Sequence, residues 1–295
     1  MAGETRDQHT VSRALLRRFA SGTPRELSVL DLSTGKTRRR GARGVFYERD
    51  FARHHVSQLE LLWKSVEDPL GGVLDKLVSE QDLAPEDHDV LKRCLALHWA
   101  RSGGIAEAHA RVYNEVLEDH IRTWAMRPDV LDRIFLEKTG LVPAGLQARL
   151  LALELLAEGA PEINDGRYFA ARLPQIFQAG LGKISPHHIQ IVTASPGTEF
   201  CIGDTPVVTS RQDRAGWGPH QRIALGDAQM ISMPLTPRFA VALHSQPNMH
   251  LDADAELVDN FNRCQCAAAR RYVAFRPGSS AQQSVSQWRD AIAAA

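Results

Sequence analysis

Side chains able to carry out acid–base and phosphate chemistry occur in five separate parts of the chain: His9, Glu60 with Glu67, Arg101, Asp204 and Asn262. Histidines and carboxylates can transfer protons, and an arginine can stabilise the charge that develops on a phosphate. Glu60 and Glu67 are almost two helical turns apart, so they share one face of a helix and could bind a divalent metal. We therefore expect His9, Glu60, Glu67, Arg101 and Asp204 to be catalytic, with the metal left unassigned.

Each of these candidates also has a structural interpretation. Glu60 could form an ion pair with Lys64 one turn later. Arg101 lies near the end of its predicted helix, where the helix dipole favours a cation. Asp204 precedes Pro206 in a predicted turn, and an aspartate in such a turn can accept backbone N–H groups.

Three further polar residues accompany the catalytic candidates, and we expect them to bind substrate. Arg13 lies one turn after His9 on an apolar helix, and His98 lies three residues before Arg101. Asn262 lies inside an apolar helix, where a buried amide needs partners. It is therefore either a structural bridge or a member of the site.

A dense run of positive charge covers residues 36–43 and includes Arg38, Arg39 and Arg40. The net charge of the chain is zero, but residues 1–44 hold ten bases and four acids, which leaves this segment at +6 and the remainder at −6. We expect the three arginines to contact phosphates of a nucleic acid or nucleotide, and the alternative is a solvated strand. No aromatic residue interleaves with the run, so the sequence does not indicate a stacking surface.

Composition excludes several classes of protein. The apolar fraction of 43% suits a folded core and is too high for a disordered chain. No apolar run approaches the roughly 20 residues of a membrane span, and the first ten residues lack the apolar region of a secretory signal. The four cysteines form no CxxC pair and the sequence shows no secretory signal, so we expect reduced thiols and a cytoplasmic location. Since no membrane span is expected either, we expect no membrane partner. Phosphate-loop, dinucleotide-binding, zinc-protease and serine-hydrolase motifs do not occur.

The pattern of apolar residues predicts one α+β domain over residues 1–280, followed by a tail or frayed helix over 281–295. Residues 1–55 read as a basic helix and a hairpin, 56–185 as a helical bundle, and 186–280 as a mostly antiparallel sheet with one helix. Pro69 and Gly71–Gly72 are expected to kink or split the first long helix. The next helix begins at Pro85, and Gly103–Gly104 is expected to end it.

Several of these motifs, in this order, resemble an uncharacterised family catalogued as domain of unknown function 4238. The opening Gln8-His9-Thr10-Val11 resembles the start of that family, with Ser12 where the family usually has proline. The two spaced glutamates, the segment from His98 to Arg101, and Gly203-Asp204-Thr205-Pro206-Val207 resemble later motifs, and so do Pro234-Leu235-Thr236-Pro237 and Phe261-Asn262. The resemblance runs along most of the chain and implies no established activity.

Two hypotheses follow from these residues. In the first, the protein is a hydrolase or transferase that acts on a phosphodiester, nucleotide or nucleic acid, for example a bacterial defence or toxin-like nuclease, because active sites gather mixed ionisable groups. In the second, the protein is a binding or regulatory protein in which the same residues form a structural network. The sequence leaves the oligomeric state open.

Overall fold

The structure is a computed structural model that describes residues 7–49, 51, 56–158, 167–210, 224–247 and 249–293. Its helices are α1 (Arg13–Phe19), a 3-10 turn η1 (Ala42–Gly44), α2 (Val56–Val78), α3 (Pro85–Ala100), α4 (Gly103–Ala125), α5 (Pro128–Thr139), α6 (Leu146–Glu158), α8 (Arg167–Ile184), α9 (Ala255–Ala268) and α10 (Ala281–Ala293). Its strands are β1 (Asp7–His9), β2 (Leu27–Asp31), β3 (Lys36–Arg40), β4 (Tyr47–Arg49), β5 (His188–Ala194), β6 (Ile202–Gly203), β7 (Val208–Ser210), β8 (Met230–Pro234), β9 (Phe239–His244), β10 (Met249–Ala253) and β11 (Tyr272–Phe275). The predicted α+β class is confirmed.

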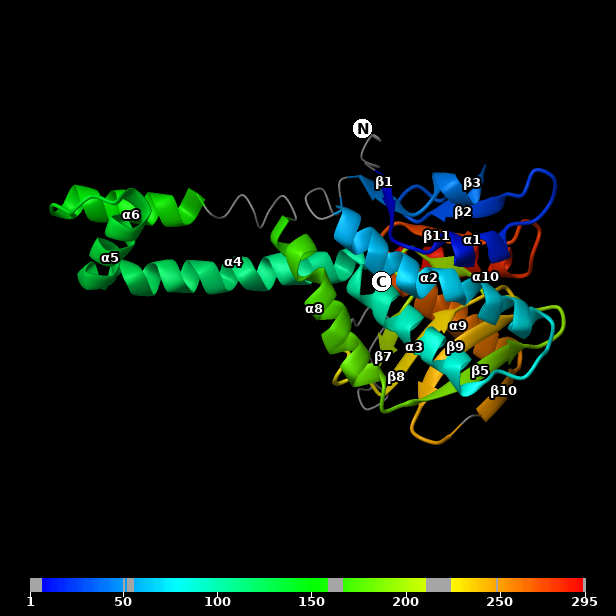
Figure 1. Cartoon of the computed structure of the whole chain (residues 1–295). Helices are drawn as coiled ribbons and strands as arrows, with labels where there is room; N and C mark the ends of the chain where they lie inside the picture. The colour runs from blue at the N-terminus through cyan, green and yellow to red at the C-terminus, as the bar shows by residue number, and fades with distance from the viewer. Residues whose placement is uncertain are drawn as a thin grey trace.

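Two larger sheets and a short two-stranded one organise the body of the molecule (Figure 1). The five-stranded sheet has the order β10-β5-β9-β8-β7, and its strands pair antiparallel except for β10 with β5. The four-stranded sheet has the order β3-β2-β11-β6, and β1 pairs with β4 separately. Because β2 pairs with β11, the N-terminal hairpin shares a sheet with strands from the other end of the chain.

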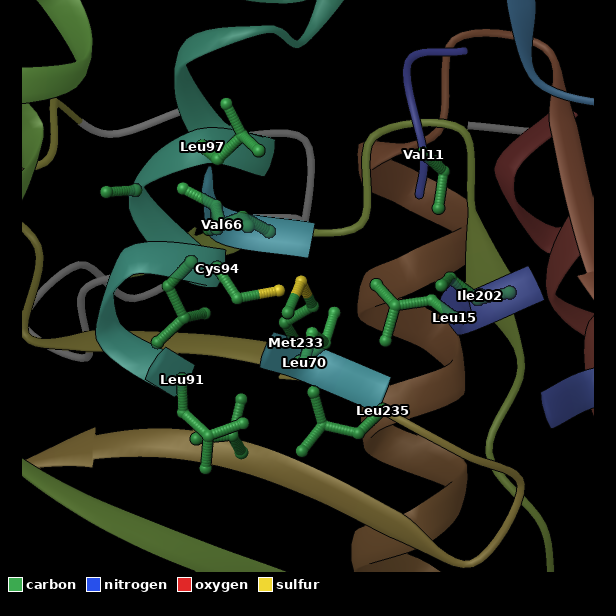
Figure 2. Packing of buried hydrophobic residues seen from close by; sticks show 14 of the residues in the cluster. Val11, Leu15, Val66, Leu70, Leu91, Cys94, Leu97, Ile202, Met233 and Leu235 are labelled. Carbon is green, nitrogen blue, oxygen red and sulfur yellow. The ribbon is translucent and has the colours of Figure 1, made fainter. Parts of the chain in front are cut away.

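The core lies between the helices α1, α2 and α3 and the five-stranded sheet. Figure 2 shows Leu15, Leu70, Cys94 and Met233 converging from four different elements, and all four side chains are fully buried. Helix α2 continues through Pro69 without a break, so the predicted split of this helix is wrong. Packing of its apolar face outweighs the backbone hydrogen bond that a proline removes.

The glycine pair at 103–104 begins a helix instead of ending one. Helix α3 ends at Ala100, and Ser102 caps α4 by accepting a hydrogen bond from the backbone N–H of Ile105. Gly103 is the first residue of α4, and a Cβ there would overlap the guanidinium of Arg270. The small residue therefore serves a close approach and not a helix C-terminus.

A helical arm projects from the body. Figure 1 shows α4 extending away from the sheets, with α5 and α6 at its far end. A small apolar cluster joins α5 to α6 through Leu131, Phe135, Ala148 and Ala152. Several large side chains on this arm are exposed, among them Met126, Val142 and Leu146.

The C-terminal segment is a packed helix up to Ala293, which corrects the expectation of a tail or frayed helix over 281–295. Ala281 and Val285 of α10 are buried against β11 and α9, and Trp288 donates a hydrogen bond to Asp259 of α9 at 3.0 Å. The sequence also missed β1, β4, β7 and β10, which are short or follow polar stretches. In the part of the chain that the structure describes, every helix is too short or too polar to cross a membrane.

Candidate functional site

The segment before α1 is fastened to α3 by His98. The backbone N–H of Ser12 donates to Nε2 of His98 at 3.0 Å, and Nδ1 donates to the carbonyl of Cys94 at 2.8 Å. This arrangement requires a neutral imidazole with its proton on Nδ1. Burial lowers the pKa of His98 well below its usual value, and the nearby Arg101 acts in the same direction. His98 therefore holds the chain through hydrogen bonds and lies away from solvent.

Arg101 joins three segments of the chain from a fully buried position. Its Nε donates to the carbonyl of Thr10 at 2.9 Å, Nη1 donates to Glu67 at 2.7 Å, and Nη2 donates to Nε2 of His98 at 2.9 Å. The guanidinium also lies over the Trp63 ring, 5.7 Å from its centroid. Arg101 is 1% exposed, so it is closed to a substrate.

His9 and Arg13 lie on the more open side of this cluster. Strand β1 places His9 opposite Tyr47 of β4, with ring centroids 6.3 Å apart, and Nδ1 of His9 lies 3.1 Å from the carbonyl of Val45. Burial lowers the pKa of His9, and the charges of Arg13 and Arg101 act in the same direction, whereas the hydrogen bond to Val45 and the charge of Glu67 act against it. The Nε of Arg13 is buried and has no hydrogen-bond partner among the described residues.

The two glutamates of α2 differ in their surroundings. One carboxylate oxygen of Glu67 accepts from Arg101, and the side chain is 28% exposed, so it faces both the buried cluster and solvent. Glu60 is half-buried and forms no ion pair with any described residue, including Lys64. Glu67 thus contacts Arg101 and acts on His9 and Arg13 only through its charge, and among the described residues Glu60 has no contact with that group.

Asp204 fastens two strands together. Its carboxylate accepts hydrogen bonds from the backbone N–H groups of Arg270 at 2.7 Å and of Arg271 and Tyr272 at 3.0 Å. Burial raises the pKa of Asp204, and the three backbone donors act in the opposite direction. The carboxylate therefore binds backbone N–H groups at the start of β11. This agrees with the structural interpretation of Asp204, in which the carboxylate accepts backbone N–H groups.

Two amides of α9 hold the segment that leads to Asp204. Asn262 accepts from the backbone N–H of Cys201 at 2.8 Å and donates to the carbonyl of Glu199 at 2.9 Å. One turn later, Gln265 accepts from the N–H of Gly203 and donates to the carbonyl of Pro206. Asn262 is thus a structural bridge, and Gln265 is a second one that sequence reasoning missed, although its position three residues after Asn262 on the apolar face was visible.

A groove of about 1040 Å³ lies beside these tethers. Strand β3, strand β4, the start of α4 and the start of β11 surround it, and Thr10 and Asp204 are among its lining residues. Phe46 lines it as well and has a φ angle of +51°, a backbone conformation that residues other than glycine rarely adopt. Two hydrogen bonds from Thr10 to the carbonyl of Phe46 hold that conformation.

The basic strand faces this groove with alternate residues. Lys36, Arg38 and Arg40 line it, and Arg39 does not, because successive side chains of a strand point to opposite faces. All residues of β3 are exposed. Of the three arginines expected to contact phosphates, Arg38 and Arg40 therefore line the groove and Arg39 does not. Lys36 is the third cation of the groove face.

The acidic residues of the groove are already paired. Arg271 donates to Asp31 at 3.1 Å, and Arg270 forms ion pairs with Glu48 and Glu107. Lys36, Arg38 and Arg40 form no ion pair with any residue that the structure describes. The uncompensated charge of the groove therefore comes from one face of β3.

Aromatic rings reach the groove from outside the basic strand. Tyr47 lines it with 47% of its surface exposed, and Tyr272 lines it beneath the guanidinium of Arg271. The sequence of the basic run does not indicate a stacking surface, and in the structure β4 and β11 bring two aromatic rings to the same groove. No sequence spacing connected them to β3.

Metal-binding geometry is absent from the described ranges, in which no three His, Cys, Asp or Glu side chains form a group that could hold a metal ion. The four cysteines are free thiols. Burial raises the pKa of the Cys94 thiol, which makes it a poor nucleophile at neutral pH.

Comparison with known proteins gives a family and nothing narrower. A family model described as "Protein of unknown function (DUF4238)" matches residues 7–279. No curated protein and no solved structure matches the chain. The family model spans the buried cluster, the amide tethers and the groove.

The buried cluster predicts that Arg101 is needed for folding. Changing Arg101 to Ala removes the donor to Glu67 and to the carbonyl of Thr10 and one of the two donors to His98, so we expect a loss of about 3–5 kcal/mol of stability. Urea unfolding monitored by circular dichroism measures this, with Arg133→Ala on the exposed surface of α5 as the control. A midpoint for the Arg101 variant equal to that of the wild type would contradict the structural role.

His98 predicts that stability falls in weak acid. Its folded-state pKa is lowered, so the unfolded chain binds a proton that the folded chain does not, and stability decreases as pH falls below the unfolded value of 6.5. One such group contributes up to about 1.4 kcal/mol per pH unit. We expect His98→Gln, which keeps an acceptor without titrating, to show a smaller difference in urea midpoint between pH 7.5 and 5.5. Equal differences in both proteins would exclude His98 as the source.

Proposed function

The chain belongs to the DUF4238 family, and we propose that it binds single-stranded nucleic acid in the groove beside β3. The observation that supports this most is the row formed by Lys36, Arg38 and Arg40, three exposed cations on one face of an edge strand with no acidic partner among the described residues. Alternate residues of a strand are about 6.6 Å apart, a spacing suited to successive phosphates of an extended strand.

The aromatic lining favours a single strand over a duplex. Tyr47 has an exposed ring on which an unpaired base can stack, and stacking combined with a basic track is the usual mode of sequence-tolerant single-strand binding. The acids that line the groove are engaged by Arg270, Arg271 and backbone N–H groups, so they add little repulsion. We propose a cytoplasmic site of action, which the free thiols support.

A second candidate function is cleavage of the bound phosphodiester, and His9 supports it. Its pKa is lowered by burial, which favours the neutral form that a general base needs, and the ring lies opposite the groove residue Tyr47 and within electrostatic reach of Glu67. In this proposal His9 accepts the proton of the attacking hydroxyl as the new P–O bond forms, and it returns that proton to the leaving oxygen as the old P–O bond breaks. Arg13 supplies the phosphate contact because Arg101 is buried. A hydrolase or transferase of this kind would suit a bacterial defence or toxin-like effector.

Binding predicts a difference between the two faces of β3. We expect Arg38→Ala combined with Arg40→Ala to weaken binding of a fluorescent single-stranded oligonucleotide at least tenfold, measured by anisotropy. The slope of log affinity against log salt should fall by about 1.4, since each phosphate contact contributes about 0.7. The matched control is Arg39→Ala with Arg43→Ala, which removes the same charge outside the groove. Equal loss in both double variants, or no binding by the wild type, would reject the groove.

Cleavage makes a separate prediction. We expect end-labelled RNA or DNA to be cut by the wild-type protein and at least 100-fold more slowly by His9→Ala, because general acid–base catalysis contributes roughly that much. The reaction is followed with and without Mg²⁺, and oligonucleotide anisotropy shows whether the variant still binds. Binding without cleavage by the wild-type protein rejects the second candidate and leaves the first one standing.

A further inference from the structure

A second basic cavity, of about 640 Å³, lies at the other end of β2 and β11 from the groove. Arg25 precedes β2 and Arg276 follows β11, and both line this cavity, whereas Asp31 and Tyr272 at the opposite ends of the two strands line the groove. The two sites are therefore distinct surfaces joined by one pair of strands.

Five arginines from four segments of the chain line the cavity, with a single acid among its lining residues. They are Arg17 and Arg18 of α1, Arg25, Arg238 from the turn between β8 and β9, and Arg276, and the acid is Glu199. Such a convergence of like charges is unfavourable in the empty protein unless each charge is compensated or hydrated. The arginines that have no acidic partner therefore determine which anionic ligand the cavity can bind.

Three of the five arginines have an acidic partner. Arg276 pairs with Glu199 through two nitrogens, which fixes the orientation of its guanidinium. Arg18 pairs with Asp75 at 2.7 Å, and Arg238 pairs with Glu80 at 3.0 Å. The last two pairs are at the surface, where such an interaction contributes little and leaves the cation available to a ligand.

The other two arginines have none. Arg17 and Arg25 are exposed and form no ion pair or hydrogen bond with any residue in the described part of the chain. Arginine matches phosphate oxygens through two parallel N–H donors, so this pair can bind more than one phosphate group.

The remaining lining suits the rest of a small ligand. Val78, Pro237 and Phe239 provide apolar surface, and Arg238 lies over the Phe239 ring at 5.6 Å. The hydroxyls of Ser21 and Ser195 add polar groups on the wall. The volume falls within the range of about 300–1,000 Å³ typical of small-molecule sites.

We propose that this cavity binds a small ligand carrying two or more linked phosphate groups. Arg17 and Arg25 provide positive charge without an acidic partner for the phosphates, and Glu199 fixes the orientation of the Arg276 guanidinium. The apolar wall accepts a flat organic group where the ligand has one. The same phosphate chemistry could come from inorganic polyphosphate or from a nucleoside triphosphate, and the organic part distinguishes the two sources.

Isothermal titration calorimetry of the full chain tests this with sodium tripolyphosphate, ATP and adenosine at constant ionic strength. We expect tripolyphosphate and ATP to bind and adenosine not to bind. Tighter binding of ATP than of tripolyphosphate would identify a nucleotide as the source, and equal or weaker binding would identify polyphosphate. Absence of binding by both phosphate compounds would overturn the proposal.

Matched variants locate the site. Arg17→Ala with Arg25→Ala should weaken tripolyphosphate binding at least tenfold with an unchanged urea midpoint, since both side chains are exposed. Arg39→Ala with Arg133→Ala removes the same charge elsewhere and should leave the affinity within twofold. Arg38→Ala with Arg40→Ala should also leave it within twofold, which separates this cavity from the nucleic-acid groove. Equal loss in the Arg17/Arg25 variant and either control pair would overturn the assignment.

Discussion

The position of the N-terminal strand depends on the hydrogen bonds that Arg101 and His98 make across the interior. Arg101 donates to the carbonyl of Thr10, and His98 accepts from the N–H of Ser12, so two buried side chains near the end of α3 fix the backbone on both sides of Val11, just after β1. A proline at position 12 could not make the second bond, because it has no N–H. Strand β4 pairs with β1, and the wall of the groove is therefore set by this contact.

A comparable device fixes the other wall. The segment 199–206 pairs with a strand over only two residues, and side chains of α9 replace much of the missing ladder. Asn262 and Gln265 each bond one N–H and one carbonyl of that segment, as a neighbouring strand would. Asp204 then collects three N–H groups at the start of β11 and so positions Arg270 and Arg271. Asp204 and Asn262, two of the site candidates from the sequence, are thus engaged in holding a wall of the groove.

Local patterns predicted most elements, since they depend on neighbours in sequence. The predicted start at Pro85 agrees with the structure, because caps and first-turn residues act within one turn. The groove was not predictable, because its ion pairs join residues more than 160 positions apart, such as Arg270 with Glu48 and Glu107. The carboxylate pair on α2 was predicted to share a face, but helical spacing did not show that only Glu67 meets Arg101.

The distribution of charge ties these observations together. The N-terminal segment carries an excess of six positive charges. Some of its cations are paired with acids and help to position the chain, as Arg18 does through Asp75. Among the cations without acidic partners in the described part of the chain, Lys36, Arg38 and Arg40 lie on the groove face of β3, and Arg17 and Arg25 line the cavity beside α1. Fold stability gains nothing from gathering unpaired like charges, which repel one another. Their placement along two concave, partly aromatic or apolar surfaces is the observation on which both binding proposals rest, and the neutral net charge of the chain conceals it.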